Sequence, residues 1–118
     1  MDWKEISKRI DNEIAIGTEI PKTTRGSRSV TRIVGERIYM RTGVETDAEK
    51  YVTKEMIRFA YENLERGFDS HMLKQRFPKE FSQGPCVFSM TGGILEKLGL
   101  AKCIRVGNRF VYVSTKRS

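Results

Sequence analysis

Apolar residues near the N-terminus recur at the spacing of a helix. The pattern predicts a helix over residues 2–14, with Asp2 as its N-cap, and Gly17 and Pro21 end it. The apolar stripe is large enough that we expect it to pack against the rest of the chain. The stripe consists of Trp3, Ile6, Ile10 and Ile14.

A β-hairpin is predicted next. Residues 29–34 and 37–42 are β-prone, and Gly35-Glu36 suits a two-residue turn. In that register Ile33 lies opposite Ile38, and Thr31 lies opposite Met40 on the same face. The other face carries Arg32, Arg37, Arg41, Tyr39, Val30 and Val34. Residues 43–50 are read as a polar connection.

The remaining pattern alternates helices with turns and ends in a second hairpin. Thr53 is predicted to cap a helix that ends at Gly67, with an apolar stripe of Ile57, Ala60, Tyr61 and Leu64. A short helix capped by Asp69 or Ser70 should stop before Pro78, and residues 78–86 are predicted as a loop. A third helix over residues 88–98 precedes β-prone segments 100–106 and 109–114, which flank Gly107-Asn108.

The length of 118 residues fits one α+β domain, in which residues 1–52 form an N-terminal helix and hairpin and residues 53–114 a second unit. The apolar content of 38% suffices for a core. No apolar run reaches membrane-helix length, and the N-terminus lacks a signal-peptide pattern, so we expect a cytoplasmic protein.

Residues 53–114 resemble a winged-helix domain. The segments that carry the resemblance are 94–101 (ILEKLGLA) and 103–112 (CIRVGNRFVY). In many winged helices the third helix ends in a leucine-rich turn, a glycine leads into the first wing strand and an aromatic residue stands on the returning strand. The resemblance implies a three-helix unit with a C-terminal hairpin wing that binds nucleic acid through the third helix and the wing. The matching residues are Leu98, Gly99, Leu100, Gly107 and Tyr112.

The formal net charge of +7 is concentrated in two stretches. Residues 22–41 contain six basic residues and one acid, and residues 97–118 contain six basic residues and no acid. This distribution favours a polyanionic partner more strongly than the charge alone does. We therefore expect nucleic acid, and double-stranded DNA rather than RNA.

Candidate nucleic-acid contacts fall in three places. Arginine binds phosphate bidentately and stacks on bases, so the hairpin arginines are candidates, although the same face would also suit plain solvation. The third helix offers hydroxyls and a lysine but no residue that reads base edges bidentately. Its Gly92-Gly93 pair is interpreted as close helix packing, in preference to close approach to phosphate. The candidates are Arg32, Arg37 and Arg41 on the hairpin, Ser89, Thr91 and Lys97 on the helix, and Lys102, Arg105 and Arg109 on the wing.

The sequence shows no pattern of residues typical of an enzyme active site. His71 is the only histidine, and Cys86 and Cys103 lack metal-ligand spacing, so we expect reduced thiols and no metal or cofactor. The acids are dispersed, and no phosphate-binding glycine loop is present.

Two other hypotheses remain. The domain would be a protein-docking module if the third helix exposes Met90 and Phe88, or a recognition subunit of a nuclease system. A homodimer or another protein partner is left open.

Overall fold

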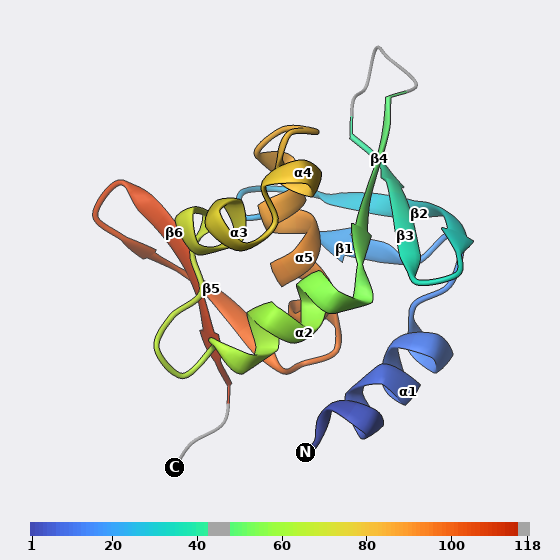
Figure 1. The fold of residues 1–118 in the computed structure, drawn as a ribbon, viewed down its shortest axis with the longest axis horizontal. Helices are drawn as coiled ribbons and strands as arrows, with labels where there is room; N and C mark the ends of the chain where they lie inside the picture. The colour runs from blue at the N-terminus through green and yellow to red at the C-terminus, as the bar shows by residue number, and fades with distance from the viewer. Residues whose placement is uncertain (43–47, 116–118) are drawn as a thin grey trace.

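The computed structural model describes residues 1–42 and 48–115, and this part of the chain forms five helices and two sheets. The class is α+β, as predicted. The four-stranded sheet lies on one side of the helices and the two-stranded hairpin on the other (Figure 1). Among the described residues, no helix has the length and apolar character needed to span a membrane.

The N-terminal helix forms where the apolar stripe predicts it. Helix α1 (Trp3–Glu13) begins at the Asp2 carboxylate, which accepts a hydrogen bond from the Glu5 N–H at 2.9 Å. Its stripe packs into the core, as predicted. Ile6, Ile10 and Ile14 are buried, and Trp3 packs against them.

A four-stranded antiparallel sheet follows, in the order β1–β2–β3–β4. The predicted hairpin is confirmed at its turn, where Gly35 has a φ of +60° and Ile33 lies opposite Ile38. The register beyond was predicted wrongly, because a bulge places Val30 rather than Thr31 opposite Met40. Val30 is therefore buried with Met40 instead of joining the arginine face. The strands are β1 (Glu19–Pro21), β2 (Ser27–Val34), β3 (Arg37–Arg41) and β4 (Glu49–Thr53).

Strand β4 was not predicted. Part of the predicted polar connection, residues 43–47, lies outside the described residues, but Glu49–Thr53 pairs with β3 along its whole length. Val52 lies opposite Ile38, and both are buried. At the outer edge of β4, the backbone forms hydrogen bonds with a side chain rather than with another strand. The Tyr51 N–H donates to Gln83 Oε1 at 3.0 Å, and Gln83 Nε2 donates to the Tyr51 carbonyl at 2.9 Å.

The helical predictions hold at their N-caps and fail at some ends. Thr53 caps α2 (Lys54–Glu62), which ends five residues before Gly67. Asp69 caps α3 (Ser70–Arg76), as predicted. Residues 78–86, predicted as a loop, include the short helix α4 (Pro78–Phe81), because proline suits the first position of a helix. Helix α5 (Cys86–Lys97) begins two residues earlier than expected.

The C-terminal hairpin is confirmed, with β5 (Ala101–Val106) and β6 (Arg109–Ser114) around the Gly107-Asn108 turn. Residue 68, between α2 and α3, pairs with β6. The Phe68 and Tyr112 backbones exchange two hydrogen bonds of 2.9 Å. This pairing ties the hairpin to the helices.

Helix α5 lies at the centre of the molecule (Figure 1), and every residue from 87 to 95 is buried. A Cβ at Gly92 would lie closer than 3.0 Å to the Tyr112 ring, and one at Gly93 would lie 2.6 Å from the Pro21 carbonyl oxygen. The interpretation of these glycines as close packing is confirmed. The hypothesis that Met90 and Phe88 are exposed was wrong, because neighbouring elements cover this helix on several sides.

Candidate nucleic-acid interface

The hydroxyl groups of α5, the helix predicted as the third helix of the winged-helix unit, do not reach the surface. Ser89 is 6% exposed and Thr91 is fully buried. The Ser89 hydroxyl donates to the Cys86 carbonyl at 3.0 Å and accepts from the Arg28 guanidinium at 2.8 Å. The Thr91 hydroxyl donates to the Val87 carbonyl at 2.7 Å. The prediction that Ser89 and Thr91 contact nucleic acid is therefore wrong for this structure.

The cause is that other elements enclose α5. Strand β1 packs on this helix where Pro21 approaches Gly93, and Arg28 of β2 bonds the Ser89 hydroxyl. Only the last turn of α5 stays open, and Lys97 is exposed there. Lys97 is thus the one predicted residue of this helix that a polyanion can contact.

The outer face of the four-stranded sheet carries a compact cluster of arginines and tyrosines. Because side chains alternate along a strand, burial of Ile38 turns its neighbours Arg37 and Tyr39 outward. Tyr51 lies opposite Tyr39 on β4, with ring centroids 5.4 Å apart. We call Arg32, Tyr39, Tyr51 and Arg37 the Arg–Tyr cluster.

Each arginine of the cluster stacks on a tyrosine. The Arg32 guanidinium lies 4.0 Å from the Tyr39 ring centroid, and the Arg37 guanidinium lies 4.3 Å from that of Tyr51. Arg37 also donates to the Tyr39 hydroxyl at 3.4 Å, and this hydrogen bond raises the pKa of the guanidinium. Stacking on a ring holds the planar group while leaving N–H donors at its edge.

One carboxylate neutralises part of this face. Glu49 accepts hydrogen bonds from Thr31 at 2.6 Å and from Arg32 at 2.7 Å, and these bonds hold its pKa below the usual value. Arg37 makes no such ion pair within the described part of the chain. Arg41, the third predicted hairpin arginine, is exposed at the end of β3.

The β5–β6 hairpin, predicted as the wing, carries the second set of basic residues predicted to contact nucleic acid. Lys102, Arg105 and Arg109 are all exposed. Arg109 forms an ion pair with Asp69 at 2.7 Å, and the Arg105 guanidinium lies 5.7 Å from the Phe110 ring centroid. The β5–β6 hairpin and the β2–β3 hairpin lie toward opposite ends of the molecule, with α2, α3, α4 and α5 between them (Figure 1). The structure therefore gives two basic surfaces rather than one. Lys116 and Arg117, further basic residues of the tail, lie outside the described residues.

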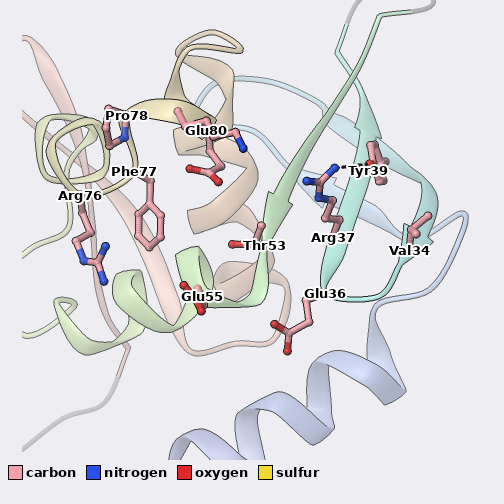
Figure 2. A pocket seen from close by; sticks show the side chains of 11 residues that line it. Val34, Glu36, Arg37, Tyr39, Thr53, Glu55, Arg76, Phe77, Pro78 and Glu80 are labelled. Atoms are coloured by element: carbon pink, nitrogen blue, oxygen red, sulfur yellow. Dashed lines mark hydrogen bonds between the residues drawn. The ribbon is translucent and has the colours of Figure 1, made fainter.

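A pocket of about 650 Å³ opens beside the Arg–Tyr cluster. Arg37 and Tyr39 line its sheet side, and Arg76, Phe77 and Glu80 line the opposite side from α3 and α4 (Figure 2). The sequence reasoning missed Tyr51 and this opposite side. One usable signal was Pro78, whose fixed φ favours a helix start directly after Phe77.

Candidate metal ligands are not clustered in the part of the chain that the structure describes. Within residues 1–42 and 48–115, no three His, Cys, Asp or Glu side chains lie close enough together to hold a metal ion. Cys86 and Cys103 are free and half-buried.

Comparison with family models, curated proteins and solved structures found no match for this chain.

Proposed function

We propose that this protein is a non-catalytic nucleic-acid-binding module that contacts phosphate through the Arg–Tyr cluster and the wing. The observation that carries the proposal is the stacking of Arg32 and Arg37 on tyrosine rings at the surface. Pre-positioned guanidinium groups bind phosphate oxygens bidentately, and the half-buried tyrosine rings hold both guanidinium groups at the surface.

The order of elements after residue 53 supports a winged-helix unit as part of the proposal. Helices α2, α3 and α5 are followed by the β5–β6 wing, and Phe68 pairs with Tyr112 of β6 in an isolated β-bridge. In this chain the third helix is covered by β1, so binding through the wing and sheet replaces readout by that helix. We therefore expect affinity for duplex DNA to depend little on base sequence, since phosphate contacts carry no sequence information.

The docking-module alternative loses its surface, because Met90 and Phe88 are buried. We retain DNA as the expected partner, and the test compares duplex with single strands.

Fluorescence anisotropy at several salt concentrations tests the proposal. Two double variants, Arg32→Ala with Arg37→Ala and Arg105→Ala with Arg109→Ala, should weaken binding to all sequences alike. Each lost phosphate contact should reduce the slope of log K against log salt by roughly 0.9 on duplex DNA. Lys4→Ala with Lys8→Ala is the matched control, because it removes two exposed charges from α1.

The control variant should bind close to the parent protein. If both arginine variants also bind as the control does at moderate salt, with an unchanged slope, then the proposed function is wrong. Circular dichroism should show all variants folded, since surface substitutions usually change stability by no more than about 0.5 kcal/mol.

A further inference from the structure

We infer that the pocket between the sheet and the α3–α4 segment receives one unpaired base, and that it prefers bases carrying an amino group. The inference rests on the proposed function, because the base would belong to a strand held by the Arg–Tyr cluster. Arg37 and Tyr39 belong both to the cluster and to the pocket lining, so the two sites are continuous.

The size and walls of the pocket suit a flat ring. Its volume of about 650 Å³ lies within the usual range for small-molecule sites. Apolar side chains line both sides, with Val34 and Tyr39 on the sheet and Phe77 and Pro78 at the α3–α4 junction (Figure 2). A base entering the opening would therefore meet apolar as well as charged side chains.

The basic residues of the pocket suit the phosphate of the same nucleotide. Arg37, Arg76 and Lys79 all line the opening. The Arg76 guanidinium lies 4.9 Å from the Phe77 ring centroid, which holds it over the apolar wall. Positive charge is therefore present on both the sheet side and the α3–α4 side of the pocket.

The acidic residues disfavour a simple anion as the ligand. Glu55 and Glu80 also line the pocket; Glu55 is exposed, and Glu80 is half-buried and within electrostatic range of Arg37. Because a carboxylate accepts hydrogen bonds and repels phosphate, a ligand that presents a donor to these groups is favoured. Cytosine, adenine and guanine offer exocyclic amino donors, whereas thymine offers none.

The two sides of the pocket are tied together before any ligand binds. The double hydrogen bond of Gln83 to the Tyr51 backbone links the segment after α4 to strand β4. A preformed site loses less free energy to ordering on binding.

The test uses single-stranded 12-mers that differ at one central position. An all-thymidine strand is compared with strands carrying one cytidine or one abasic site, with dissociation constants measured by anisotropy. We expect the cytidine strand to bind roughly tenfold more tightly than the all-thymidine strand. Glu55→Ala with Glu80→Ala should abolish this preference without weakening binding of the all-thymidine strand.

Glu5→Ala with Glu65→Ala is the matched control, because it removes two exposed carboxylates outside the pocket, and it should keep the preference. Equal affinity for the three strands, or a preference that survives in the pocket variant, overturns the inference while leaving salt-dependent binding and the proposed function intact. Absence of binding to every strand and duplex overturns both.

Discussion

Substitution of Gly92 by alanine should destabilise the fold, although helix propensity alone predicts the opposite. Alanine is favoured over glycine in a helix interior by roughly 1 kcal/mol. In this structure, however, a Cβ at position 92 would lie closer than 3.0 Å to three atoms of the Tyr112 ring, a separation that real Cβ atoms essentially never show.

The ring has little room to retreat. Tyr112 is fully buried, its ring centroid lies 5.1 Å from that of Phe88, and its backbone is bonded to Phe68. Restoring ordinary contact requires a shift of about 1 Å or more in a close-packed core, and overpacking of this kind typically costs about 1–3 kcal/mol. Because three atoms of a fully buried ring are involved, we expect a cost in the upper part of this range, about 2–3 kcal/mol. After the gain of about 1 kcal/mol in propensity, a net loss of about 1–2 kcal/mol remains, with a fall in melting temperature of roughly 3–10 °C.

Thermal and urea unfolding of Gly92→Ala, Tyr112→Leu and the double variant measures this effect. Because Tyr112→Leu removes the clashing ring, Gly92→Ala should be less harmful in its presence, which gives a favourable coupling energy. Lys97→Ala, on the exposed last turn of α5, is the control and should stay within about 0.5 kcal/mol of the parent. A melting temperature for Gly92→Ala at or above that of the parent would refute the reasoning.

Two further predictions concern stability. Within the described part of the chain, a carboxylate oxygen of Glu96 is buried without a hydrogen-bond partner, and burial raises the pKa of this carboxyl group. The folded state therefore binds the proton more tightly, so the parent loses stability as the pH rises from the ordinary carboxyl pKa through the raised one. Glu96→Gln should melt higher than the parent at pH 7, and a difference that does not shrink in acid would contradict this assignment. Ile10→Ala should cost about 2–5 kcal/mol in urea unfolding, because Ile10 is buried in the core. Lys8→Ala on the same helix should be nearly neutral, and equal effects of these two changes would mean that α1 does not pack as described.

The parts of the fold that local chemistry decides were predictable from the sequence. Asp2, Thr53 and Asp69 each cap a helix, because a short oxygen-bearing side chain satisfies an N–H at the helix start. Gly35 and Gly107 mark the two hairpin turns, where both adopt a positive φ. These features need only a few neighbouring residues.

The parts that depend on distant partners were not predictable. Strand β4 begins with two charged residues and becomes recognisable only through its pairing with β3. The burial of Ser89 and Thr91 depends on elements that are distant in the sequence, among them β2, whose Arg28 bonds the Ser89 hydroxyl. The available signal in the sequence was the adjacent pair Gly92 and Gly93. The absence of a side chain at Gly92 allows the Tyr112 ring to approach the helix, and its absence at Gly93 allows Pro21 to do so.

The candidate interface divides in the same way. The strand period predicts that Arg37 and Tyr39 share an outward face with Arg32, and the structure places them together. It does not predict that Tyr51 completes the cluster or that Phe77 faces it across a pocket. Both relations come from tertiary packing.

The side-chain amide of Gln83 also has a consequence for self-association. An unpaired strand edge is a template on which another chain can add a strand. At the middle of β4, the N–H and carbonyl that such a strand would need are already bonded to Gln83. On the opposite side of the sheet, β1 ends in Pro21, which has no N–H to donate and packs on α5 at Gly93. The four-stranded sheet is thereby closed to growth at both of these positions, which protects a protein with β-rich segments against edge-to-edge aggregation.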